Sequence, residues 1–333
     1  MKKNVKVLLA GLALIYLLCM VVYGYMHDSS AKEERCRISI IVYGTNLDRW
    51  AFMREGISQG AKDFGAEVSV INMSSEADAK EQIDLLSREI ENGAQGILMA
   101  AADSEAVNEA VTAAAAKVPV LMIETGIKDS DKTLGLLAAD DYGMGKMLGE
   151  MVGSEHRKIA LIYEYTERDS VKRRYQGFMD GVGEDADVLL WERGEGDFRL
   201  SLYIDKMYRM EGDGRALVAL DDVALEQTLD AVTEIREKKH REESPEHMQQ
   251  APEVYGIGAT DKIVYYLDKG SIGGLVFQNE FSIGYLGMEQ MVNYLDNEAS
   301  VRQMQEISIE YYKATRENMY DPELQRLLFP IVQ

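Results

Sequence analysis

The sequence has few residues that build disulfide or metal sites, with only two cysteines and four histidines among 333 residues. Cys19 and Cys36 cannot form a disulfide framework, and Cys36 is either a free thiol or the partner of a second chain. The histidines are scattered without metal-ligand spacing, at His27, His156, His240 and His247. We therefore predict a protein that uses neither a metal nor another cofactor.

Basic residues are also scarce. The chain has 36 lysines and arginines but 57 aspartates and glutamates, which gives a net charge of −21. Such a charge disfavours nucleic acid and anionic lipid as partners. It is typical of a solvated acidic surface that keeps a domain soluble.

Motifs of common enzyme classes are missing or misplaced. There is no P-loop, and Gly56-Ile57-Ser58-Gln59-Gly60 matches the G-x-S-x-G of serine hydrolases inside a predicted helix instead of at a strand-to-helix turn. Gly143-Met144-Gly145-Lys146-Met147-Leu148-Gly149 has the wrong spacing for a dinucleotide loop. We expect both glycine sets to permit close helix packing, the first against the sheet. An enzyme on an α/β scaffold remains the alternative function.

The N-terminal segment has the pattern of a signal anchor. Lys2, Lys3 and Lys6 precede an uncharged apolar run over residues 7–26, long enough to cross a bilayer as a helix. The run exceeds the usual apolar region of a cleaved signal, about 7–15 residues, although cleavage near Ala31 is the alternative. We predict an uncleaved transmembrane anchor and short linker over residues 1–31, with the rest of the chain extracytoplasmic.

The stretch over residues 37–56 sets the plan for the rest of the chain. Residues 38–43 form an apolar run typical of a strand buried on both faces, Gly44 begins a polar turn, and an amphipathic helix follows from Trp50. Because ligands of open parallel sheets lie beyond the carboxyl ends of the strands, residues 45–50 are the first candidate site.

The same strand–loop–helix unit is repeated several times, in two consecutive series along the chain. The first run of units extends to the glycine-containing helix near residue 143, and a second run begins at residue 158. Two such runs predict an α/β protein with two doubly wound parallel-sheet lobes and a cleft between them. The expected strands are 38–43, 67–71, 96–100, 119–123, 158–163, 188–191, 216–220, 254–257 and 275–277. The expected helices follow Trp50 and cover 79–90, 104–116, 170–182, 200–210, 222–238, the segment from 262, and 283–295. Residues 238–251 are expected to form a charged surface loop.

Seven short motifs, in this order and spacing, carry a family resemblance. They are Gly93-Ala94-Gln95-Gly96-Ile97-Leu98, Asp103-Ser104-Glu105-Ala106-Val107, Val118-Pro119-Val120, Ala138-Ala139-Asp140-Asp141, Arg174-Tyr175-Gln176-Gly177-Phe178, Leu220-Asp221-Asp222-Val223-Ala224-Leu225 and Val276-Phe277-Gln278-Asn279. From residue 37 onward the chain resembles the ribose-type periplasmic sugar-binding proteins, which share their fold with the lactose-repressor ligand domain.

The resemblance implies a monomer whose lobes join through a three-segment hinge and close on a small ligand. We expect crossovers near Asp140, Gln278 and Ile307, with lobes over 37–140 plus 279–307 and 141–278 plus 308–333. With no helix-turn-helix ahead of the domain, it implies a receptor that serves an ABC permease or a membrane sensor histidine kinase, and no nucleic acid.

The resemblance also implies where a ligand would bind. The family's hydroxyl-binding positions fall on Asn46, Leu47, Glu124, Arg174, Asp221, Gly258 and Gln278, and its stacking aromatics fall near Arg49 and Trp50. Thr125 stands where an arginine is common, and Gly258 where an aspartate is usual, so a ligand other than ribose is favoured. The alternatives are a surface cation for Arg174 and core packing for Trp50. As a pocket residue in an open cleft, Arg174 is expected to lie in water until ligand binds.

Overall fold

The computed structural model describes residues 16, 20, 35–46, 48–155, 158–192, 200–211, 215–242, 252–296 and 307–329. Contacts between residues divide the chain into two compact units, Met1–Cys36 and Arg37–Gln333. The anchor predicted over 7–26 lies outside the described residues except for positions 16 and 20. None of the helices in the described ranges combines the length and apolar character that crossing a membrane requires.

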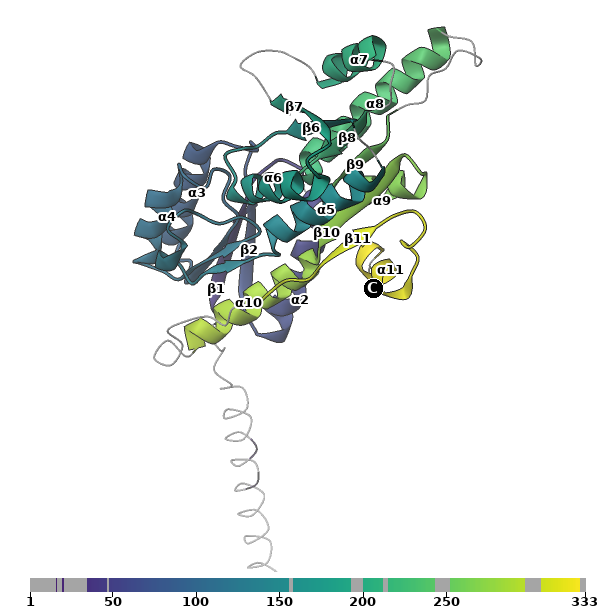
Figure 1. Cartoon of the computed structure of the whole chain (residues 1–333). Coiled ribbons are helices and arrows are strands. Elements are labelled where there is room, and N and C mark those ends of the chain that lie inside the picture. The colour runs from purple at the N-terminus through teal and green to yellow at the C-terminus, as the bar shows by residue number, and fades with distance from the viewer. Residues whose placement is uncertain are drawn as a thin grey trace, which may run out of the picture. The chain divides into compact units, whose positions relative to one another are not determined.

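The first lobe is built on a five-stranded parallel sheet in the order β2-β1-β3-β4-β5. Its central strand β1 is the predicted apolar run, and its residues 38–42 are all buried. Helices α2 and α10 pack together on one face, and α3 and α4 lie on the other (Figure 1). The strands are β1 (Arg37–Val42), β2 (Glu67–Asn72), β3 (Gly96–Met99), β4 (Val120–Ile123) and β5 (Leu136–Leu137). The helices are η1 (Asp48–Trp50), α2 (Ala51–Asp63), α3 (Ala79–Glu91), α4 (Asn108–Ala115), η2 (Ser130–Lys132) and α10 (Glu280–Asp296).

The second lobe has a six-stranded sheet in the order β11-β10-β9-β8-β6-β7. Helices α5 and α6 pack against each other, and α7, α8 and α9 contribute to the apolar core beneath the sheet. The strands are β6 (Lys158–Tyr163), β7 (Asp187–Glu192), β8 (Ala216–Ala219), β9 (Val254–Ile257), β10 (Ile272–Gln278) and β11 (Tyr311–Ala314). The helices are α5 (Asp141–Glu155), α6 (Asp169–Val182), α7 (Leu200–Glu211), α8 (Asp222–Glu242), α9 (Asp261–Asp268) and α11 (Pro322–Leu328).

The two parallel-sheet lobes agree with the fold predicted from the sequence, with differences at the C-terminal end. Strand β11 pairs antiparallel with β10, so the second sheet is not wholly parallel. Neither β11 nor α11 was predicted. The prediction of a loop over 238–251 is wrong for its first residues, because α8 continues to Glu242. The rest of that segment, residues 243–251, lies outside the described ranges.

Glycines bring two pairs of helices into backbone contact. A Cβ on Gly145 of α5 would collide with the carbonyl oxygen of Arg174 in α6, and one on Gly177 with that of Tyr142. A Cβ on Gly56 of α2 would likewise meet the Phe281 carbonyl oxygen in α10. The prediction of close packing is confirmed, but the partner of α2 at these glycines is α10 and not the sheet. The α5–α6 contact fixes the backbone from which Arg174 projects.

Replacing Gly177 with alanine is expected to lower the free energy of unfolding by about 1–3 kcal/mol, since the methyl group must push two helix backbones apart. Urea denaturation measures the change. Gly126→Ala is the control, because its Cβ would approach only the tip of the Leu136 side chain, at 3.3 Å. Equal stability of the two variants would contradict the close packing of α5 and α6.

Candidate ligand-binding site

A cavity of about 310 Å³ lies where the carboxyl ends of the two sheets face each other. Its volume is at the lower end of the range for small-molecule pockets, roughly 300–1,000 Å³. The walls combine charged groups with aromatic rings contributed by elements of both lobes. The lining residues include Arg49, Phe52, Glu124, Arg174, Asp222, Gly258, Thr260, Phe277, Gln278, Glu280 and Phe281.

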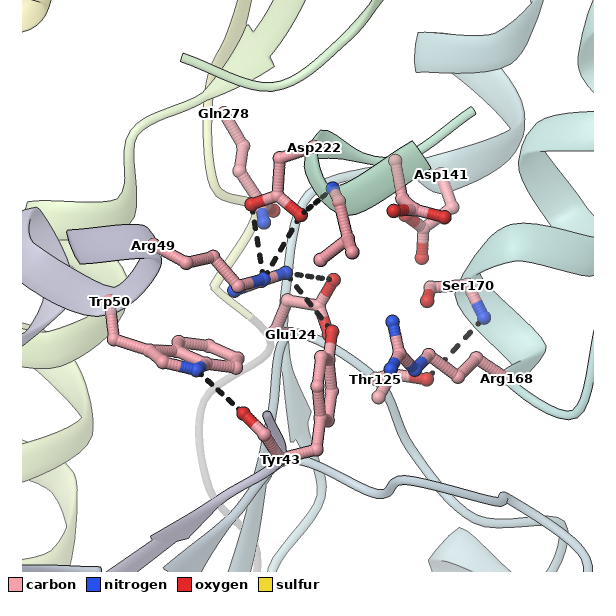
Figure 2. A network of polar contacts seen from close by, with 12 residues as sticks. Tyr43, Arg49, Trp50, Glu124, Thr125, Asp141, Arg168, Ser170, Asp222 and Gln278 are labelled. Atoms are coloured by element: carbon pink, nitrogen blue, oxygen red, sulfur yellow. Dashed lines mark hydrogen bonds and ion pairs between the residues drawn. The ribbon is translucent and has the colours of Figure 1, made fainter. Parts of the chain in front are cut away.

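Arg49 joins the two lobes across this cavity. It lies in η1, directly after the loop that follows β1, and its Nε contacts both carboxylate oxygens of Asp222 at 3.0 Å. Its Nη2 donates to the hydroxyl of Tyr43 at 3.0 Å and to Oε1 of Glu124 at 3.4 Å. The Tyr43 hydroxyl in turn donates to Oε2 of Glu124 at 2.7 Å. Figure 2 shows the guanidinium of Arg49 between the two carboxylates.

Trp50 packs against the guanidinium of Arg49 and does not line the cavity. The Arg49 guanidinium carbon lies 3.7 Å from the centroid of the Trp50 ring, close enough for a cation–π contact. The indole Nε1 donates to the backbone oxygen of Tyr43 at 2.9 Å, and the ring is only 1% exposed. The indole therefore packs as a core residue that orients the arginine.

Arg174 makes the second set of ion pairs. Its Nε donates to Oδ1 of Asp141 at 2.8 Å, and its Nη2 to Oε1 of Glu124 at 3.3 Å. The side chain is 3% exposed, so the alternative of a surface cation is wrong. The expectation that Arg174 lies in water before ligand binds also differs from the structure, because Asp141 at the start of α5 already holds it.

Glu124 is the meeting point of both arginines. It follows β4 with φ of 61°, in the left-handed region that non-glycine residues seldom adopt. Burial by itself would raise the pKa of Glu124, but Arg49, Arg174 and the Tyr43 hydroxyl hold that pKa below its ordinary value. The carboxyl is therefore ionised, and it can accept hydrogen bonds from both lobes.

Arg168 connects the two lobes at a second point. Its guanidinium stacks on the Tyr43 ring at 3.6 Å, and its Nη2 donates to the backbone oxygen and to Oε2 of Glu76 at 2.7 and 3.0 Å. The Ser170 amide donates to Oγ1 of Thr125 at 3.4 Å. Figure 2 shows the Arg168 guanidinium beside Thr125, the position where the family resemblance leads one to expect an arginine.

Comparison with known proteins agrees with this architecture. Residues 38–299 match the family described as a periplasmic binding protein domain. The chain belongs to the periplasmic binding protein family. The family resemblance inferred from the sequence is thereby confirmed, and the enzyme alternative loses its support, because this family consists of binding proteins. No curated protein matches the chain.

Solved structures share the fold at low sequence identity. A carbohydrate transporter solute-binding protein from Agrobacterium radiobacter, in complex with D-arabinose, is 21% identical with a TM-score of 0.76, covering 89% of this chain and all of that one. A Caulobacter myo-inositol binding protein is 17% identical with a TM-score of 0.70, over 87% and 97% of the two chains. A chain of a XylFII–LytSN complex is 16% identical with a TM-score of 0.68, over 85% and 98%.

In this periplasmic binding protein, five of the residues expected at the site line the cavity, namely Arg49, Glu124, Arg174, Gly258 and Gln278. Arg49, Glu124 and Arg174 are buried in its wall, and Gln278 lies at the end of β10. The Oε1 atom of Gln278 accepts a hydrogen bond from the Ala139 amide at 3.3 Å, which ties two of the crossover segments together.

Other expected residues lie elsewhere. Asn46 is exposed and accepts a hydrogen bond from the Asp48 amide at 3.0 Å, as a turn residue does. Asp221 is buried but accepts from the Ala224 amide at 2.9 Å and so caps α8, outside the cavity wall. Leu47 lies outside the described residues. Trp50, as shown above, packs behind Arg49.

Gly258 lines the cavity, and its departure from the family pattern has a steric reason. Its φ is +136°, and an added Cβ would come within 2.6 Å of the Asp222 Cβ. An aspartate cannot fit there while Asp222 occupies the space.

Four residues of the site were not predicted from the sequence: Asp222, Tyr43, Arg168 and Glu280. The one signal for Asp222 was the acidic pair at the start of α8.

Glu280 makes the stability of the protein depend on pH. It is the first residue of α10 and lines the cavity, and burial raises its pKa to about 8 against the attraction of Arg49. An unfolded glutamate has a pKa of about 4.3, so the folded state retains a proton that the unfolded state releases. The stability that this proton provides is fully present below about pH 4 and is lost as the pH rises to about 8.

We expect the free energy of unfolding of the unliganded protein to fall between pH 5 and pH 8, as measured by urea denaturation. Glu280→Gln should flatten this slope. Glu109→Gln, in the first turn of α4 and outside the cavity, should keep it. An unchanged slope in Glu280→Gln would show that another group titrates.

Proposed function

We propose that this protein is an extracytoplasmic receptor that binds a sugar or a similar small polar ligand in the cavity between its lobes. The observation that supports this most is the convergence of Arg49, Glu124, Arg174 and Asp222 on one cavity, all nearly fully buried. Carboxylates and guanidiniums engage hydroxyl groups with defined geometry, and the rings of Phe52 and Phe277 offer apolar cover for a sugar's C–H face.

The ligands of similar solved structures agree with a sugar-like ligand. One of these structures holds D-arabinose, one α-D-tagatopyranose and one myo-inositol. All three compounds are small and densely hydroxylated, which is the chemistry that the cavity wall fits.

The lobes proposed are residues 37–140 plus 279–307 and residues 141–278 plus 308–333, joined by crossovers near Asp140, Gln278 and Ile307. Support comes from α10, which packs with α2 on the first sheet, and from β11, which pairs with β10 in the second. The crossover strands also contact one another, through the bridge between Ala139 and Ile309 and the hydrogen bond from the Asn279 amide to the Glu310 carbonyl.

For its place in the cell we propose attachment to the membrane through residues 1–31 and a partner that is an ABC permease or a sensor histidine kinase. Membrane attachment together with an altered pocket favours sensing over uptake. The similarity to a chain of the XylFII–LytSN complex fits the proposal that such a domain works with a partner protein.

A thermal-shift screen of pentoses, hexoses and polyols with the purified full-length protein tests this function. A ligand at 100 times its dissociation constant stabilises the fold by about 2.7 kcal/mol, so at least one compound should raise the melting temperature clearly. Nuclear magnetic resonance of the same mixture should show the compound chemically unchanged. A screen without any hit, or a hit that is consumed, would contradict the proposed function.

A further inference from the structure

The charges around the cavity do not balance. Arg49 and Arg174 are the two buried cations in its described wall, and their ion pairs engage three buried carboxylates, Glu124, Asp141 and Asp222. One excess negative charge remains before Glu280 is counted. The other buried guanidinium nearby, Arg168, is paired with Glu76. The remaining basic side chain of the wall, Arg326, is exposed, and its Nε donates to the Pro322 carbonyl oxygen.

Glu280 adds a carboxyl that has no hydrogen-bonding partner among the described residues. It lies where β10 crosses into α10, next to Asn279, whose side chain caps the helix by accepting from the Ser282 amide. The charged groups that act on it come from four other elements: Arg49 of η1, Glu124 after β4, Arg174 of α6 and Asp222 of α8. Even with both arginines and a helix N-terminus nearby, burial keeps the pKa of Glu280 near 8. At neutral pH the carboxyl therefore keeps its proton, because the site lacks the positive charge that would stabilise its ionised form.

A hydrogen-bond donor in the same wall also lacks a partner. The Nη1 atom of Arg49 is buried and makes no hydrogen bond in the described structure, although Arg49 is only 5% exposed. A buried donor without an acceptor lowers the free energy of unfolding. Because Arg49 lines the cavity, a ligand can supply the acceptor. A ligand oxygen is the group that would satisfy it.

Aromatic rings complete the surroundings of Glu280. Phe277 precedes it at the end of β10, Phe281 follows it in α10, and Phe52 of α2 lines the same cavity. Ring faces attract ammonium groups by cation–π interaction, most strongly where water is excluded. Aromatic rings beside an unpaired carboxyl form a favourable environment for an organic cation.

We propose that the ligand carries a protonated amine in addition to hydroxyl groups, with Glu280 pairing the amine and Arg49 donating to a hydroxyl oxygen. An amine-bearing sugar has this chemistry. The inference rests on the proposed function and narrows its ligand class. A neutral sugar could accept a hydrogen bond from Arg49 but would leave Glu280 protonated and without a partner. A ligand with an ammonium group would also stabilise the ionised carboxylate of Glu280 and supply the positive charge that the cavity lacks.

The test compares three pairs of probes by isothermal titration calorimetry with the full-length protein near pH 7. The pairs are glucosamine with glucose, galactosamine with galactose, and mannosamine with mannose. In at least one pair we expect the amine-bearing sugar to bind about tenfold or more tightly than its neutral parent, which is 1.4 kcal/mol of added binding free energy. The corresponding N-acetylated sugar, which has no charge, should lose this advantage.

Two variants assign the effect to the residue. Glu280→Gln should reduce the preference for the amine to less than about threefold, since it keeps the shape and removes the charge. Glu109→Gln, outside the cavity, should keep the preference. Neutral sugars that bind as tightly as their amine counterparts would overturn the inference and leave the proposed function standing. If neither kind binds, the proposed function fails with it.

Discussion

Replacing Arg174 with alanine is expected to lower the free energy of unfolding of the unliganded protein by about 3–5 kcal/mol, the usual cost of removing one partner from a buried ion pair. The guanidinium holds Asp141 Oδ1 at 2.8 Å and Glu124 Oε1 at 3.3 Å, and all three side chains are at most 6% exposed. Without it, Asp141 keeps its burial and loses its cation. Urea denaturation measures the loss.

Arg173 provides a matched control, because it precedes Arg174 on α6 and is exposed. Arg173→Ala should change the stability by no more than about 0.5 kcal/mol, as most surface substitutions do. If Arg174→Ala were as stable as Arg173→Ala, the buried ion pairs would contribute nothing to the unliganded state, and Arg174 would act on ligand alone.

Replacing Arg49 with alanine is expected to weaken ligand binding by about 10- to 150-fold. A hydrogen bond to a charged group is worth about 1.5–3 kcal/mol, and each 1.4 kcal/mol is one factor of ten. The variant loses the donor Nη1, which has no partner in the described structure, and it loses the bridge to Asp222 that holds the lobes together. Isothermal titration of the compound found in the thermal-shift screen measures the change.

Arg54 serves as the control for this variant, since it lies on the exposed side of α2 and away from the cavity wall. Arg54→Ala should bind with the affinity of the parent protein. Small-angle scattering of unliganded Arg49→Ala should also show a larger radius of gyration, because one of the cross-lobe ion pairs is missing. Parent-like affinity in Arg49→Ala would mean that the ligand lies elsewhere.

Much of the fold could be predicted from the sequence, because it depends on local patterns. The apolar run that became β1 and the following turn and helix are legible in about 20 residues, and the same unit recurs along the chain. Strand β11 escaped prediction because a short, partly exposed edge strand has no such run. The anchor predicted over 7–26 remains a prediction.

The site was only partly predictable, because its partners are far apart in the sequence. Glu124 and Arg174 came from a family resemblance, but their ion pair joins residues 50 positions apart. Arg49 contacts Asp222 across 173 positions, and no local pattern specifies such a pairing. The resemblance pointed to Asp221, one residue away from Asp222. The first turn of a helix decides which of two neighbours caps it and which faces the cavity.

The charge deficit could not be predicted from composition either. A net charge of −21 describes the whole chain, whereas the imbalance that matters arises from which carboxylates are buried with which arginines. Glu280 has a sequence environment typical of a helix start. It lines the cavity only because α10 packs near Arg49 of η1 and Asp222 of α8.

The most direct test of the account is a crystal structure of the protein grown with the stabilising compound from the screen. We predict one molecule in the cavity between the lobes, with an oxygen within hydrogen-bonding distance of Arg49 Nη1 and with residues of both sheets around it. A compound bound on the outer surface of a single lobe, with no ligand between Arg49, Glu124 and Arg174, would contradict it.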